Sequence, residues 1–289
     1  MGWRTVVVDS IAKVSCKNGY LSVQGEEVTM IHLSEIDSLM IATTQATITA
    51  FALWQLAENK IRVIFCDEKH NPYGELSLYY GCHNSSKKLK LQYGWDAGLK
   101  QKIFGEIVRI KIINQANFLA ECGASDKAEE LYAYAAGVMP GDPDNKEGLA
   151  AKIYFVTLYG LGFSRDTPSS INAALDYGYA VILSAVNREV ALNGCLSQLG
   201  LKHANEFNPY NFSCDLMEPF RIAVDRYVYQ HREEEFQKEY KYNLAALITK
   251  PITAYGKDTT LGQVIKIFVK SVIDALNSGN LAELKLYEF

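Results

Sequence analysis

The spacing of apolar residues changes near Asp96, and this change limits the folds open to the chain. Before about residue 80, apolar and polar residues tend to alternate, whereas after Asp96 apolar residues recur every three or four positions, as at Ile103, Ile107 and Ile110. Alternation is typical of half-buried strands, and the longer period is typical of amphipathic helices. The sequence therefore predicts a two-domain α+β fold, in which a small N-terminal β-rich domain precedes a larger all-helical domain. A chain of 289 residues is long enough for both.

The N-terminal segment carries several strand patterns and one helix pattern. Asn18-Gly19 separates two alternating runs and is the strongest short signal for a β-hairpin. Asn71-Pro72-Tyr73-Gly74 is rich in turn-forming residues and predicts a turn. The predicted strands span 3–8, 12–16, 20–23, 28–33, 39–42 and 62–66, and the predicted helix spans 49–59.

A polar run beginning at His83 marks the predicted boundary between the two domains. We place the β-rich domain at 1–82, a linker at 83–95 and the helical domain at 96–289. Five or more helices are expected in the last of these segments.

The sequence favours a cytoplasmic protein. The longest apolar stretch, 173–190, is interrupted by charged residues and predicts a buried helix rather than a membrane span. The first residues resemble a strand and lack the features of a signal peptide. The six cysteines are scattered without a CxxC pair, which favours reduced thiols over a zinc site or a disulfide framework.

The net charge of −4 conceals two segments of opposite sign. Residues 87–111 contain seven basic and two acidic residues, whereas residues 112–150 contain seven acidic and two basic ones. An acidic segment beside a basic one suits a metal site that also holds a polyanion. Solvated faces of unrelated helices explain the same pattern equally well.

Three polar sites far apart in the sequence form a ligand set suited to a hard divalent ion. Glu147 lies in DPDNKEG, His203 in GLKHANEFNPYN, and Asp215 and Glu218 in DLMEPFR. Carboxylate oxygens with one imidazole nitrogen suit Mg²⁺ or Mn²⁺, which serve phosphoryl-transfer chemistry.

Taken singly, each of these residues also has a structural explanation. Glu147 has the position of a first-turn glutamate, which favours the positive end of a helix dipole. His203 lies in a polar loop, where a histidine is usually solvated. Because Pro219 fits the first turn of a helix, Asp215 and Glu218 would lie at that helix start and cap it.

Five cations near these residues in the sequence are candidate contacts to phosphate groups. Each is explained equally well as a solvent-exposed charge or as a charge at a helix C-terminus. They are Lys152, Arg165, Arg188, Lys202 and Arg221.

The sequence resembles one known family, the CRISPR-associated integrase, which is the metal-dependent nuclease of the spacer-acquisition complex, in its type II-A branch. The resemblance covers nearly the whole chain, and DLMEPFR after a GLKH turn, with an upstream Asn-x-Glu-Gly, is specific as a set. The matching stretches are DPDNKEGLAAKIYF, FSRD, NAALDYGYAVILS, GLKHANEFNPYNFSCDLMEPFR, GWRTVVV and IHLSEID.

The resemblance implies a catalytic metal site in the helical domain. A glutamate, a histidine and a downstream Asp or Glu hold the ion in this family, and the matching positions are Glu147, His203 and Glu218. The family often has aspartate where this chain has Glu218, and both supply a hard oxygen ligand. Asp215 matches a second acidic position, and it would either bind the ion or orient His203.

The resemblance also implies a reaction and an assembly. The 3′-hydroxyl of a short captured DNA would attack a phosphodiester at the edge of a CRISPR repeat, with Mg²⁺ or Mn²⁺ as cofactor, and so insert a new spacer for antiviral immunity. Two homodimers would flank a dimer of a small ferredoxin-like partner, and double-stranded DNA would lie across this heterohexamer. The β-rich domain would form the seam of each homodimer.

Two other functions are compatible with the same residues. One is a stand-alone metal-dependent nuclease that acts on branched or single-stranded DNA, and it would need neither the small partner nor a repeat substrate. The other is a non-catalytic scaffold that binds DNA and partners, and it would neither join nor cleave DNA in the presence of Mn²⁺.

Overall fold

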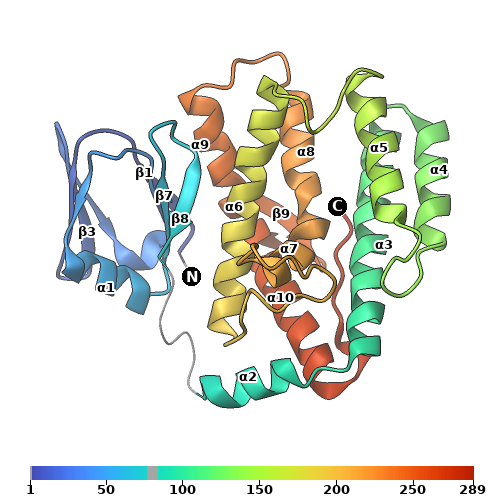
Figure 1. Ribbon diagram of the computed structural model, residues 1–289. Coiled ribbons are helices and arrows are strands. Elements are labelled where there is room, and N and C mark those ends of the chain that lie inside the picture. The colour runs from blue at the N-terminus through green and yellow to red at the C-terminus, as the bar shows by residue number, and fades with distance from the viewer. Residues whose placement is uncertain (1, 77–83) are drawn as a thin grey trace.

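A β-rich N-terminal part packs beside a largely helical remainder in the computed structural model, which describes residues 2–76 and 84–289 (Figure 1). The predicted domain boundary between residues 82 and 83 lies outside the described residues. Within the described ranges, no helix is both long and apolar enough to cross a membrane.

The N-terminal part contains two four-stranded sheets. The first has the strand order β1-β5-β7-β8, in which β1, β5 and β7 are parallel and β8 is antiparallel. The second has the order β4-β3-β2-β6, and helix α1 contacts strands of both sheets. These elements are β1 (Arg4–Val8), β2 (Lys13–Lys17), β3 (Tyr20–Gln24), β4 (Val28–His32), β5 (Ile36–Ile41), β6 (Thr47–Ile48), α1 (Ala50–Glu58), β7 (Arg62–Cys66) and β8 (Pro72–Glu75).

The hairpin prediction is confirmed, whereas the turn predicted at 71–74 is wrong. β2 and β3 pair antiparallel, and their turn residues Asn18 and Gly19 have φ angles of 51° and 80°, which asparagine and glycine tolerate best. Pro72 instead begins strand β8, where its missing N–H is tolerated. The turn comes earlier, because the Asp67 carboxylate accepts hydrogen bonds from the backbone N–H groups of residues 69 and 71.

Both faces of the first sheet are buried, one against the second sheet and the other against the helical part. Successive side chains of a strand point to opposite faces of its sheet. Alternate residues of β5 and β7 consequently belong to different hydrophobic cores. One set packs against the second sheet: Leu39, Ile41 and Val63. The other set packs against the helical part: Met40, Ile64 and Cys66.

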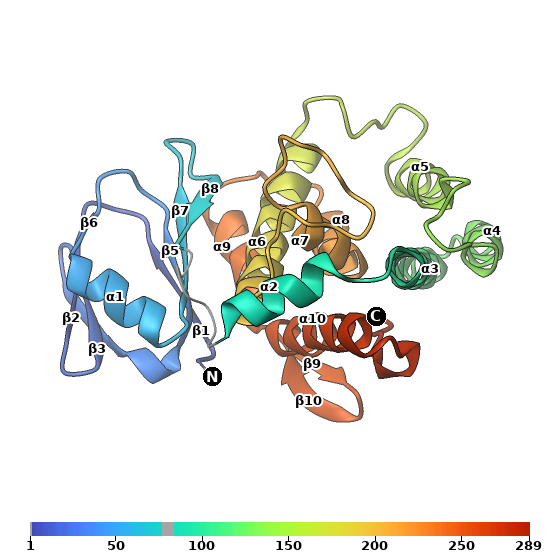
Figure 2. The ribbon, with the colours of Figure 1, turned by 60° about the horizontal axis from the view of Figure 1, so that its bottom comes forward.

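The remainder of the chain is helical except for one hairpin, so the prediction of an all-helical domain is wrong in detail. Strands β9 (Pro251–Ala254) and β10 (Lys257–Thr260) pair antiparallel beside α10 (Figure 2). The helices are α2 (Ser85–Tyr93), α3 (Ala97–Glu121), α4 (Ser125–Ala136), α5 (Lys146–Tyr159), α6 (Ser170–Leu192), α7 (Asn211–Met217), α8 (Arg221–Gln230), α9 (Lys238–Ala246) and α10 (Leu261–Ser278).

Two of these helices bear on predictions from the sequence. Helix α2 occupies most of the segment that we predicted as a linker, which is therefore regular structure. Helix α6 confirms the buried helix predicted over 173–190, and like α9 it packs against the first sheet (Figure 1).

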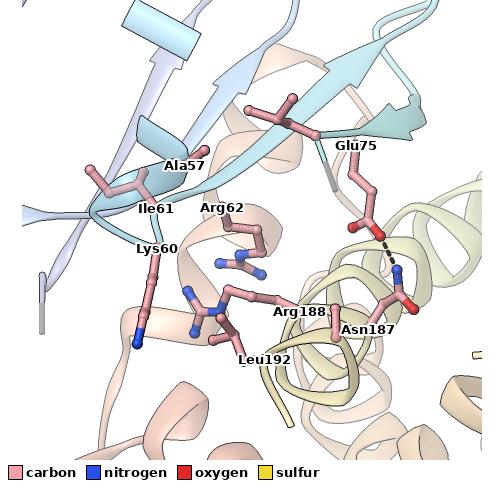
Figure 3. Close-up of a pocket in the computed structure, with 10 residues that line it drawn as sticks. Ala57, Lys60, Ile61, Arg62, Glu75, Asn187, Arg188 and Leu192 are labelled. Atoms are coloured by element: carbon pink, nitrogen blue, oxygen red, sulfur yellow. Dashed lines mark hydrogen bonds between the residues drawn. The ribbon is translucent and has the colours of Figure 1, made fainter. Parts of the chain in front are cut away.

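A buried ion-pair network joins α6 to the first sheet. The Asp37 carboxylate accepts hydrogen bonds from Arg62 Nη2 at 3.0 Å and from Arg188 Nη1 at 3.1 Å. Arg62 and Arg188 line a small cavity of about 40 Å³, across which Asn187 of α6 donates to Glu75 of β8 (Figure 3). Burial lowers the pKa of Arg62 to about 10, although the neighbouring Asp37 charge opposes this shift. Two guanidinium groups from different parts of the fold therefore share the Asp37 carboxylate, and Arg188 has a second buried carboxylate, that of Glu189, at 3.1 Å.

Replacing Asp37 with alanine should destabilise the protein strongly. Both arginines would lose their shared counter-charge in a buried setting, which costs about 3–5 kcal/mol. The free energy of unfolding, measured by urea denaturation, checks this. The control is Asp176→Ala, which removes the 68% exposed partner of Arg165 and should cost below about 1 kcal/mol. Equal decreases in the free energy of unfolding of the two variants would contradict the proposed contribution of the buried network to stability.

Candidate active site

The loop before α5 fixes the direction of Glu147. The Asp142 carboxylate accepts hydrogen bonds from the backbone N–H groups of Lys146 and Glu147, at 2.9 and 3.0 Å. Asn145, with a left-handed φ of 51°, caps the helix by accepting from the N–H of Gly148. Glu147 therefore lies in the first helical turn, as its sequence position predicted.

Glu218 lies at a break between two helices rather than at a helix start. Helix α7 ends at Met217, Glu218–Phe220 form a single 3₁₀ turn, and α8 begins at Arg221. Pro219 has no N–H to continue the α-helical ladder, which explains the tighter turn. The predicted capping role for Asp215 and Glu218 is wrong, because Asp215 lies within α7 and neither side chain caps a helix here.

The two glutamates meet at one ammonium group. Lys111 Nζ, on α3, lies 2.6 Å from Glu147 Oε1 and 2.5 Å from Glu218 Oε2. Arg221 binds the other oxygen of Glu218, through Nε at 3.0 Å and Nη2 at 2.9 Å. Only 4% of the Glu218 side chain and 11% of the Lys111 side chain are exposed. Two carboxylates from separate helices thus share one buried cation.

This arrangement keeps both partners ionised. Burial on its own would raise the pKa of Glu218, but Arg221 and Lys111 outweigh it and lower that pKa to about 2. Burial on its own would lower the pKa of Lys111, but Glu218 and Glu147 outweigh it and raise that pKa. The site therefore holds charged oxygens in a place that is largely shielded from water.

Asp215 organises the loop that carries His203. Its fully buried carboxylate accepts hydrogen bonds from the backbone N–H groups of Leu201, Lys202 and His203, and it contacts His203 Nδ1 at 2.6 Å. Gly200 permits this close approach, since a Cβ there would lie 2.3 Å from the carbonyl oxygen of His203. With Nδ1 engaged, Nε2 is the nitrogen of His203 that is available to an ion.

The carboxylates and the imidazole fit a hard divalent ion to different degrees. Glu147 and Glu218 already converge on one cation, and Glu218 Oε2 is buried without a hydrogen bond of good geometry in the described part of the chain, despite its ion pair with Lys111. Within residues 2–76 and 84–289, no group of three or more His, Cys, Asp or Glu side chains is arranged to hold a metal ion. The two glutamate carboxylates are therefore suited to bind a divalent ion, whereas His203 does not join them as a third ligand in this structure.

Reasoning from the sequence missed two residues of this site. Lys111 is the last basic residue of the 87–111 segment, but nothing in its neighbours distinguishes it from a solvated lysine. Asp225 follows Glu218 by two helical turns, a spacing that places both on one side. Its buried carboxylate accepts a hydrogen bond from Tyr179, and burial raises the pKa of Asp225 to about 6.

The five cations predicted to contact phosphates differ in whether their side chains are already engaged by other groups of the protein. Lys152 is exposed on α5. Arg165 binds Asn172 and Asp176, Lys202 donates to the carbonyl oxygen of residue 141, Arg221 pairs with Glu218, and Arg188 lies in the buried Asp37 network.

Asp215→Asn should lower the pKa of His203. The hydrogen bond from the imidazole to Asp215 is the largest influence on this pKa and raises it above the ordinary 6.5, while burial opposes it. Because the folded-state pKa is raised, the stabilisation from the protonated imidazole is complete below pH 6.5 and disappears as the pH rises through the raised value.

An NMR titration of the imidazole checks the shift, with Asp166→Asn, an exposed aspartate, as the control. An unchanged titration in Asp215→Asn would show that Asp215 does not govern His203.

Comparison with known proteins identifies the family. Residues 5–250 match the family described as CRISPR associated protein Cas1. The chain is 34% identical over 295 residues to the CRISPR-associated endonuclease Cas1 of Neisseria meningitidis serogroup C (strain 8013), an alignment that covers all of this chain and 97% of that protein.

Two solved structures share the fold. A chain of a Cas6-RT-Cas1–Cas2 complex superposes with a TM-score of 0.75 and 18% identity over 99% of this chain, which spans 36% of that longer chain. A casposase bound to an integration product superposes with a TM-score of 0.73 and 18% identity, over 96% of this chain and 92% of that one. On the strength of the family match and the near-complete alignment to the Neisseria protein, this chain belongs to the Cas1 family of CRISPR-associated proteins.

Proposed function

We propose that this chain is a metal-dependent DNA integrase and endonuclease that inserts short DNA fragments into a CRISPR array. The observation that carries the proposal is the convergence of Glu147, in the first turn of α5, and Glu218, in the turn before α8, on one buried cation, with His203 near enough for both carboxylates to influence its pKa. Membership of the Cas1 family, which includes the 34% identical endonuclease of Neisseria meningitidis, supports the same activity.

The reaction is an in-line transesterification at phosphorus. The 3′-hydroxyl of the captured DNA attacks a phosphodiester at the repeat edge, a new P–O bond forms, and the 3′-oxygen of the cleaved strand leaves. Glu147 and Glu218 would hold Mg²⁺ or Mn²⁺, His203 Nε2 would join them as the third ligand that the family resemblance implies, and the ion would supply charge neutralisation at the phosphate.

The residues of the chain have separable roles in this proposal. Glu147 and Glu218 provide the ionised oxygens, and Asp215 holds the loop and the imidazole in place without contacting DNA. Arg221 stays beside the phosphate position, where its charge favours the transition state. His203 as a general base is a weaker alternative.

The partners follow from the family and from one exposed strand. We propose a homodimer sealed through the β-rich part, where edge strand β4 exposes Val28 and Met30 by 64% and 56%. We also propose that two such dimers bind a dimer of a small ferredoxin-like partner, as suggested by the likeness to a Cas1–Cas2 complex, and that this heterohexamer carries double-stranded DNA. The type II-A branch rests on the sequence motifs alone.

Glu147→Gln should abolish joining of a 3′-hydroxyl DNA end to a repeat target, with a loss of about 100-fold or more, because it removes a charged oxygen from the ion. A joining assay with Mg²⁺ or Mn²⁺, with and without the small partner, measures this. Glu130→Gln, on the exposed face of α4, is the matched control and should retain wild-type joining.

The same assay separates the alternatives. Cleavage of branched DNA without the partner, and no joining with it, would favour the stand-alone nuclease. Tight DNA binding with neither joining nor cleavage would favour the scaffold. Full activity of Glu147→Gln would show that the metal assignment is wrong.

A further inference from the structure

Lys111 occupies the point at which the two glutamate side chains meet. Its ammonium lies 2.6 and 2.5 Å from one oxygen of each glutamate, and the three side chains come from α3, α5 and the turn before α8. Mg²⁺ binds carboxylate oxygens at about 2.0–2.1 Å. An ion bound by these two oxygens would therefore coincide with the position that Nζ holds, and the two cations would also repel each other.

We propose that Lys111 is a positioning residue that holds the place of the divalent ion in the metal-free protein and withdraws when the ion enters. This inference rests on the proposed function, because it presumes that Glu147 and Glu218 bind the ion. The ammonium prevents the two carboxylates from repelling each other and keeps them converged. The ion then finds its oxygen ligands already assembled.

The structure also provides a second position for the displaced side chain. A cavity of about 150 Å³ adjoins Lys111 and Glu218, and its other polar lining residues are Gln115, Asp225, Arg165, Tyr179 and Arg221. Gln115 follows Lys111 by one helical turn, so the two share a face of α3. Its side-chain oxygen is buried and has no hydrogen-bond partner in the described part of the chain, and only 4% of the residue is exposed.

A buried amide oxygen without a partner is unusual and costs free energy. The flexible four-carbon stem of Lys111 allows its ammonium to turn toward Gln115 and Asp225, where it would satisfy this oxygen and face a second carboxyl group. The Lys111 ammonium therefore has two positions: one between the glutamates and one in the cavity. The second position places the ammonium beside the Asp225 carboxyl group, while the two arginines that also line the cavity are paired with Asp176 and Glu218.

The first test measures Mn²⁺ affinity by electron paramagnetic resonance of free Mn²⁺, without DNA. Lys111→Met should bind Mn²⁺ on the order of tenfold more tightly than wild type, because no ammonium has to be displaced. In chelator its thermal unfolding midpoint should fall, since the carboxylates lose their counter-ion. Lys102→Met, at an exposed position of the same helix, should match wild type in both measurements.

The second test separates displacement from simple charge repulsion by a double-mutant cycle with Gln115→Met. In the presence of Lys111 this change removes the side-chain oxygen that would accept a hydrogen bond from the displaced ammonium, and it should weaken Mn²⁺ binding about tenfold. In the Lys111→Met background it should have no effect. Equal effects of Gln115→Met in both backgrounds, or unchanged affinity in Lys111→Met, would overturn the proposal.

The outcomes also distinguish this inference from the proposed function. If neither wild type nor Lys111→Met binds Mn²⁺, the metal site itself is wrong and the inference falls with it. If the cycle behaves as expected but DNA joining is absent, the inference stands and the integrase function fails. If Mn²⁺ binds and joining occurs without coupling between the two positions, the inference alone fails.

Discussion

The meeting of two carboxylates at a single ammonium group constrains much of the helical part of the chain. Removing one partner of a buried ion pair costs about 3–5 kcal/mol, so the elements that carry these groups cannot separate cheaply. Helix α3 supplies Lys111 and, one turn later, Asn114. The Asn114 amide donates to the carbonyl oxygen of Pro219 at 3.2 Å, and its oxygen accepts from the N–H of Phe289 at 3.0 Å. The same helix thus holds the turn that bears Glu218 and the last residue of the chain.

The local structure of this chain could largely be predicted from its sequence, because local structure depends on near neighbours. Periodicity located the strands, and Asn18-Gly19 identified its hairpin. The errors at Pro72 and at residues 251–260 have a common cause. In both places strand pairing with a distant or following segment outweighed local preferences, which are weak for short strands. The Tyr255-Gly256 turn, with φ angles of 52° and 72°, was a signal that could have revealed the second hairpin.

The candidate site could be predicted only in part: the sequence identified candidate ligands but not the side chains that contact them. Motifs named Glu147, His203, Asp215 and Glu218, but a motif does not state which group compensates a charge. Lys111 lies 36 residues from Glu147 and is separated from Glu218 by the four helices α4 to α7, so no local pattern connects them. For Asp215 the sequence left two roles open, and three backbone N–H groups on its carboxylate favour the supporting one.

The sheet that faces two cores makes the chain less modular than its two-part sequence suggests. Met40, Ile64 and Cys66 belong to the core of the helical part, although they lie on strands of the N-terminal part. If the chain were cut between its two parts, the N-terminal segment would expose these side chains to water. The helical segment would lose the contact of Arg188 with Asp37 and the sheet that packs against α6. Exchange of one part between distant relatives would therefore require matching both surfaces at once. Inheritance of the chain as a whole is the route that this architecture favours.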